Sequence, residues 1–221
     1  MKFTRSLMVS AIFLLIAVGM AVWLYPELPA RIPSHWNVHG QVDRYMPRFW
    51  GAVMPALMIL GGAILMVVLP LISPRRFAIT PFGRIYVLVM LVVQAFVLVV
   101  GVTVLLAGAG YAVPVPLIAM LAVGVLFMVL GNYMGKLRKN FFMGIRTPWT
   151  LASDAVWERT HRMGGWAFIL GGVVLIVGAL VGGVLWPVIA AVVIAAVIPV
   201  AYSFVIYRRL EGPRHTRGDN A

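Results

Sequence analysis

The chain has 221 residues, of which 62% are hydrophobic and only 11% are charged, and its formal net charge is +12. Soluble domains carry about 25% charged residues, so this composition excludes an ordinary soluble domain and indicates an integral membrane protein. The chain has no cysteine, which excludes disulfides, thiol catalysis and cysteine-ligated zinc or iron–sulfur sites.

Six apolar segments are long enough to cross a bilayer as helices, since a membrane-spanning helix needs about 20 residues. The first follows a short basic N-terminus and is longer than the core of a typical signal peptide, so we predict a retained anchor. The predicted spans are 6–25, 50–72, 84–107, 115–134, 164–182 and 187–207. The predicted fold class is therefore an all-α integral membrane protein, a bundle of six transmembrane helices whose last two form a tight helical hairpin.

The basic residues are distributed very unequally between the two sides of this predicted bundle. Fifteen Lys and Arg residues lie on the side that holds both termini, and three lie on the other side. Cytoplasmic loops of membrane proteins are enriched in Lys and Arg, so both termini are predicted to be cytoplasmic. The positive charge then reflects topology and attraction to anionic lipids, and it gives no support to nucleic-acid binding.

Two loops are long enough to hold structure, and each belongs to one of two predicted domains. Residues 1–72 form a two-helix N-terminal domain with an outward loop at 26–49. Residues 73–221 form a four-helix domain with a cytoplasmic loop at 135–163. We expect any specific binding to involve these loops, because the spans carry almost no ionisable groups. The same scarcity disfavours a small-solute transporter driven by protons.

The outward loop contains a polar cluster made of Glu27, His35, Asn37, His39 and Asp43. His35 and His39 are four residues apart, which places both imidazoles on one side if the segment is helical, and Asp43 or Glu27 offers a carboxylate. One interpretation is a zinc-type metal site in a metal-binding membrane protein or enzyme. We favour the other interpretation, a structural or partner-facing cluster, because no third ligand is fixed and Gly40 weakens the helix assumption.

The cytoplasmic loop is basic and contains helix-breaking residues. Gly144 permits backbone conformations that other residues avoid, and Pro148 restricts the residue before it to extended geometry. Arg146 is therefore presented from a constrained backbone. Its guanidinium suits bidentate pairing with a carboxylate, and its predicted partners are Asp154 and Glu158, with which it would form an internal latch.

A helix is predicted to begin near residue 153, with Thr150 or Ser153 as its N-cap. Trp157 and His161 share one face of it, and we expect it to lie at the lipid headgroups with Trp157 as its anchor. Lys136, Arg138 and Lys139 are also expected to face headgroups. The candidate partner-binding surface or latch comprises Asn140, Gly144, Arg146, Trp149, Asp154, Trp157 and His161.

The cytoplasmic loop with its flanks resembles the SdpI family of bacterial membrane proteins. The matching residues are Gly131, Asn132, Lys136, Asn140, the run from Gly144 to Thr150, Trp157, Thr160 and His161. The outward loop resembles a domain of unknown function that often precedes that family's region. Its matching residues are Leu28, Pro29, Ile32, Pro33 and the run from His35 to Gly40, without Val38.

The resemblance implies an inner-membrane immunity or receptor protein. Such a protein would protect the cell from a secreted antimicrobial peptide toxin met by its outward loop, and would relay the toxin's presence to a cytoplasmic regulator. Enzymatic activity and cofactors are not expected, because the sequence has no His-Glu-x-x-His, Gly-x-Ser-x-Gly or phosphate-loop pattern. The metal-binding protein and the transporter are the alternatives.

Overall fold

The computed structural model describes residues 3–211, so Lys2, Arg214 and Arg217 of the predicted charge asymmetry lie outside the described residues. Within this range six helices are long and apolar enough to cross a membrane, as predicted. The long helices are α1 (Phe3–Leu24), α2 (Arg48–Ile72), α3 (Gly83–Gly108), α4 (Val115–Met134) and α6 (Asp154–Leu180). The last span comprises α7 (Leu185–Val192), a π-helical segment (Val193–Val197) and α8 (Ile198–Glu211), and the shorter elements are the strands β1 (Arg31–Trp36) and β2 (Val42–Pro47) and the helix α5 (Pro148–Ala152).

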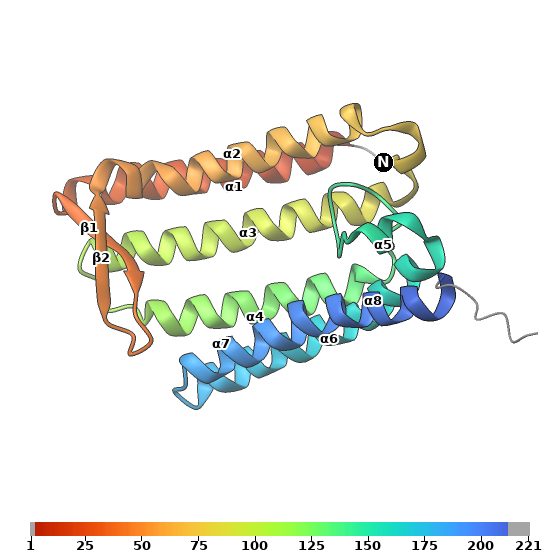
Figure 1. Ribbon diagram of the computed structural model, residues 1–221. Helices are drawn as coiled ribbons and strands as arrows, with labels where there is room; N and C mark the ends of the chain where they lie inside the picture. Colours follow the sequence, from red (N-terminus) through yellow and green to blue (C-terminus); the bar gives the residue numbers. More distant parts are fainter. Residues whose placement is uncertain (1–2, 212–221) are drawn as a thin grey trace, which may run out of the picture.

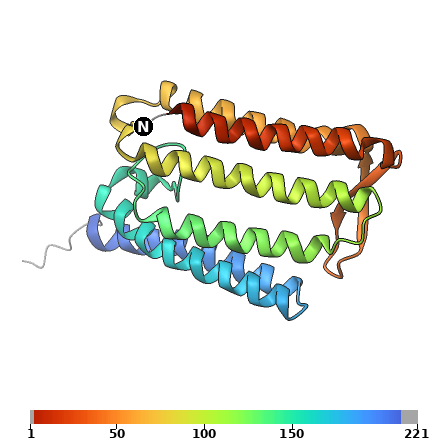
Figure 2. The same cartoon turned by 180° about the vertical axis from the view of Figure 1, so that it is seen from behind.

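The long helices run side by side in one bundle, with α1, α2 and α3 grouped on one side and α4, α6, α7 and α8 on the other (Figures 1 and 2). The strands β1 and β2 lie at one end of the bundle, which we call the hairpin end. The N-terminus, α5 and the α2–α3 connection lie at the opposite end, which we call the basic end (Figure 1). The two loops singled out in the sequence are therefore at opposite ends of the molecule.

The loop at 26–49 forms an antiparallel β-hairpin rather than the helical segment that the His35–His39 spacing would need for a shared metal site. The three prolines at its start disfavour a helix, and Gly40 in the turn has a φ of 75°, a conformation that glycine adopts without strain. Ile32 of β1 is fully buried with Leu24 and Leu105. This contact packs the hairpin on the ends of α1 and α3, so an otherwise helical bundle gains a small sheet.

The helices α4 and α6 pack backbone against backbone through two pairs of glycines. Gly124 faces Gly172, and Gly131 faces Gly165. A Cβ atom built on any of the four would lie 2.5–2.9 Å from a backbone oxygen of the facing glycine. Each helix carries its two glycines seven residues apart, which is about two helical turns, so they recur on one face. Small residues permit this close approach of membrane helices.

The helix α6 also packs on its other side, because each of its two facing glycines has a glycine next to it in sequence. A Cβ atom on Gly171 would lie 3.3 Å from the carbonyl oxygen of Ala191 in α7, and one on Gly164 would lie 2.7 Å from the side chain of Ile145, in the connection between α4 and α5. The Gly-Gly doublets therefore let α6 approach a neighbour on two faces. α6 begins at Asp154 and ends at Leu180, so the helix predicted to begin near residue 153 and the fifth span are a single helix.

Candidate functional site

The connection between α4 and α5 is closed on itself by the side chain of Asn140, which is fully buried. Its amide nitrogen donates to the carbonyl oxygens of Arg138 and Met143, at 2.8 and 3.2 Å. Its amide oxygen accepts from the backbone N–H groups of Phe142 and Met143, at 2.8 and 2.7 Å. Both donors and both lone pairs of this amide are used, so Asn140 fixes the loop rather than offering itself to a partner.

His161 joins this loop to α6 through both of its ring nitrogens. Nε2 accepts from the backbone N–H of Ile145 at 3.0 Å, so it carries no proton. Nδ1 lies 2.9 Å from the carbonyl oxygen of Trp157 and therefore donates to it. The imidazole is thus a neutral, fully buried connector, with its tautomer set by these two partners.

Trp157 stacks on the His161 ring, with ring centroids 3.9 Å apart, which confirms that the two share a face of the helix. Its side chain is only 1% exposed, and its indole N–H donates to the carbonyl oxygen of Leu137 at 2.8 Å. The prediction of Trp157 as a headgroup anchor is wrong. The α4–α5 loop covers the indole and supplies its hydrogen-bond partner.

Gly144 has a φ of 99°, as expected for a glycine at a sharp turn. A Cβ atom at this position would overlap Nε2 of His161. The residue is therefore needed for two reasons: its backbone conformation is unfavourable for other residues, and the His161 ring occupies the space where a side chain would be.

The short helix α5 ties the loop to α8. Thr147 caps α5 by accepting from the backbone N–H of Thr150, while the Thr150 hydroxyl accepts from the N–H of Thr147. The indole N–H of Trp149 donates to the hydroxyl of Ser203 in α8 at 2.6 Å. Ser153 is the N-cap of α6, as one of the two predictions had it. Ser203 lies far away in the sequence, and no local pattern could have pointed to it.

The ion pairs at the basic end differ from the predicted latch. Arg146 donates to the carbonyl oxygen of Phe141 and does not contact Asp154 or Glu158. Asp154 instead pairs with Lys139 at 2.6 Å. Glu158 pairs with Arg138 at 3.3 Å, so neither loop cation is simply directed at headgroups. Both partners of the Arg138–Glu158 pair are more than half exposed, and exposed pairs contribute about 0–1 kcal/mol, so this pair does not hold the bundle together. The Lys139 side chain is only 12% exposed, whereas that of Asp154 is 80% exposed.

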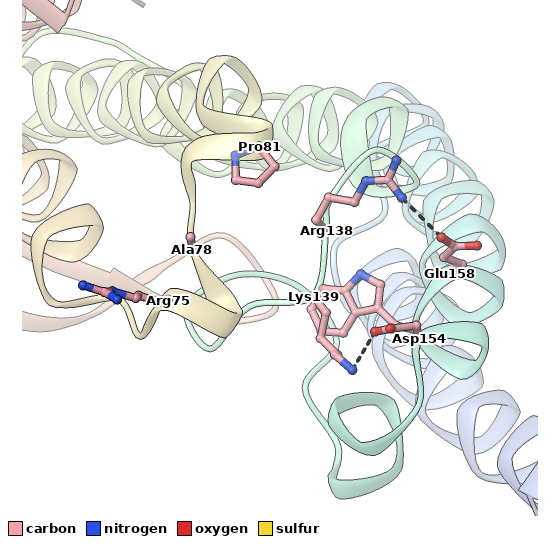
Figure 3. A pocket seen from close by; sticks show the side chains of 8 residues that line it. Arg75, Ala78, Pro81, Arg138, Lys139, Asp154 and Glu158 are labelled. Atoms are coloured by element: carbon pink, nitrogen blue, oxygen red, sulfur yellow. Dashed lines mark hydrogen bonds and ion pairs between the residues drawn. The ribbon is translucent and has the colours of Figure 1, made fainter.

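A cavity of about 340 Å³ opens between these ion pairs and the α2–α3 connection. Arg75, Ala78 and Pro81 form one wall, and the Arg138–Glu158 and Lys139–Asp154 pairs form the opposite wall (Figure 3). Trp157 also lines it. Arg75 was not among the predicted site residues, because only the folding of the bundle brings it to the same cavity as the loop after α4.

At the hairpin end the structure brings together some of the predicted cluster. Nδ1 of His35 lies 2.5 Å from the carboxylate of Asp43, across the two strands. The Asn37 side-chain oxygen accepts from the backbone N–H groups of His39 and Gln41 and so shapes the turn. Glu27 lies apart from them, in the 3₁₀ turn that follows α1. Among residues 3–211, no three His, Asp or Glu side chains are grouped so that they could hold a metal ion.

Two families of known sequences match the segments just described. A domain of unknown function, DUF1648, matches residues 12–60, which run from α1 through the hairpin into α2. The SdpI/YfhL protein family matches residues 136–203, from the α4–α5 loop to the serine that binds Trp149. Residues 136–203 of this chain are therefore similar to the SdpI family. The resemblance predicted from the two loops is therefore confirmed, and the SdpI-family region contains Asn140, Gly144, Trp157 and His161.

Similarity to one SdpI-family protein extends well beyond these segments. Immunity protein SdpI from Bacillus subtilis (strain 168) is 24% identical over 208 residues, which cover 93% of this chain and 98% of that protein. No solved structure matches the chain.

Proposed function

We propose that this chain is a membrane immunity protein that protects its cell from a secreted peptide toxin. The observation that carries the proposal is the end-to-end similarity to Immunity protein SdpI, which includes both loop regions. The architecture supports it, because a folded hairpin stands at one end of a bundle whose spans are almost free of charge (Figure 1). Relay to a cytoplasmic regulator is the finer part of the proposal, and we assign it to the basic end, where Arg146 is exposed.

The hairpin is the element that we expect to meet the toxin. Its His35–Asp43 pair links the two strands beside the turn. Val38 in the turn and Tyr45 in β2 are exposed. An exposed hairpin with an apolar and an aromatic side chain, stiffened by a cross-strand pair, is a suitable surface for an amphipathic peptide. The bundle below it gives the hairpin a fixed position at the membrane surface.

Expression of the chain should protect toxin-sensitive cells, and Asp43→Asn should weaken that protection. The test uses Bacillus subtilis lacking its own immunity protein, challenged with a panel of secreted antimicrobial peptides. Because both side chains of the lost pair are well exposed, the pair contributes at most about 1 kcal/mol, so the tolerated toxin concentration should fall by up to about fivefold. Glu211→Gln, which removes one carboxylate at the opposite end, should leave protection unchanged at equal protein level. The proposal is wrong if no peptide is resisted while the Bacillus subtilis protein protects.

The proposed orientation places both termini in the cytoplasm and the hairpin outside. Because the chain has no cysteine, a single introduced cysteine reports its own position. In intact cells a membrane-impermeant maleimide should label Val38→Cys in the hairpin turn and should not label Arg209→Cys near the end of α8. Both should react after the membrane is permeabilised. If only Arg209→Cys is labelled in intact cells, the orientation is the opposite of the proposed one.

A further inference from the structure

The cavity at the basic end lies where the membrane spans stop. The span of α2 ends at Ile72 and the next begins at Thr80, so Arg75 and Ala78 lie in the short connection between two spans. The opposite wall comes from the loop after α4 and from the first turns of α6. Residues just beyond the ends of transmembrane helices lie at the level of the lipid headgroups, so a headgroup can reach this cavity from the bilayer.

The charges that line the cavity favour an anion. Three cations, Arg75, Arg138 and Lys139, face two carboxylates, Asp154 and Glu158. Lys139 and Arg138 each hold one of these carboxylates, whereas no ion pair within residues 3–211 involves Arg75. The exposed Arg75 side chain starts from the wall opposite the two pairs and points away from them (Figure 3). A long exposed side chain changes rotamer within nanoseconds, so its guanidinium can swing over the opening.

We propose that this cavity binds the phosphate group of an anionic phospholipid headgroup, with Arg75 and Arg138 donating to its oxygens. The planar guanidinium fork matches two phosphate oxygens, and such charge-assisted bonds are stronger than neutral ones. Glu158 competes with the phosphate for Arg138, but only weakly, because both partners of the pair are more than half exposed and their atoms are 3.3 Å apart. Lipid is favoured over soluble phosphate because the cytoplasmic leaflet concentrates anionic phosphates at this level.

The test is lipid binding to the purified full-length protein in detergent micelles, and native mass spectrometry measures the amount of lipid bound. Phosphatidylglycerol should bind more tightly than phosphatidylcholine, and inorganic phosphate should not displace it. Arg75→Gln should weaken phosphatidylglycerol binding about fivefold, since one cation near the surface is lost. Arg209→Gln, an exposed arginine of α8 outside the cavity, is the matched control and should change the affinity less than twofold.

A variant with the opposite expected sign separates binding from misfolding. Glu158→Gln removes a carboxylate that competes for Arg138. Phosphatidylglycerol should therefore bind severalfold more tightly to this variant than to the unchanged protein. If Arg75→Gln and Arg209→Gln lose the same affinity for phosphatidylglycerol, the lipid is attracted to the charged surface in general, and the proposed site is wrong. Equal binding of the two lipids, or displacement by inorganic phosphate, would overturn the lipid assignment. The measurement does not depend on immunity, so the two proposals can fail separately.

Discussion

Replacing Gly172 with alanine should destabilise the protein by about 3 kcal/mol, because α4 and α6 touch through their backbones at this point. The added Cβ would lie 2.5 Å from the carbonyl oxygen of Gly124 and 3.1 Å from the backbone nitrogen of Met128. Backbone atoms cannot rotate away as a side-chain tip can, so the helices must separate. Alanine is favoured over glycine in a helix by about 1 kcal/mol, which is too little to offset this cost. Unfolding in detergent, followed by circular dichroism, measures the change.

Gly61→Ala is the matched control for this prediction. Gly61 also lies inside a transmembrane helix, α2, but a Cβ atom there would have no neighbour within 4 Å. This variant should unfold at the same temperature as the unchanged protein or slightly above it. If Gly172→Ala proves as stable as Gly61→Ala, then α4 and α6 do not touch through their backbones at Gly172.

Replacing Gly144 with alanine should cost about 3–5 kcal/mol, through two separable effects. A non-glycine residue at a φ of 99° costs about 1–3 kcal/mol in backbone strain. The new methyl group also displaces the His161 ring, which breaks its hydrogen bond from the Ile145 N–H. A buried donor without a partner costs about 1–3 kcal/mol. The same unfolding measurement applies.

Gly110→Ala isolates the first of these effects. Gly110 has nearly the same φ, 93°, but a Cβ atom there would meet nothing within 4 Å. This variant should lose only the strain energy, so it should be about 2 kcal/mol more stable than Gly144→Ala. Equal losses in the two variants would mean that the His161 connection contributes nothing to stability.

The transmembrane plan was predictable from the sequence because lipid imposes one strong requirement, a long apolar helix with its backbone hydrogen bonds satisfied internally. The hairpin was harder to predict from the sequence. Its alternation is interrupted by Pro33 and by an irregular register near His35, so the segment shows no clean strand period. The two histidines suggested a helical spacing, and only the paired strands place Asp43 beside His35.

Side-chain partners at the basic end were mostly mispredicted, and the path of one loop explains why. Reasoning from nearby charges assigned Asp154 to Arg146, but Asn140 folds the loop so that Lys139 reaches Asp154 instead. Trp157 was predicted as a headgroup anchor, but the same loop covers its indole ring and buries it. The seven-residue spacing of glycines in α4 and α6 was visible in the sequence, and it was the missed signal for their close packing.

The π-helical segment Val193–Val197 has a consequence for how the last span meets the rest of the bundle. The small residues that this span buries recur at strict four-residue intervals: Pro187, Ala191, Ala195, Pro199 and Ser203. In a regular α-helix each four-residue step turns the stripe by about 40°, so Ser203 would point roughly 160° away from Pro187. A π turn holds one extra residue and reverses most of that drift. The register slip in mid-membrane is thus what keeps Ser203 on the buried face and within reach of Trp149. If all residues of the span took regular α-helical geometry, that hydroxyl would turn toward lipid.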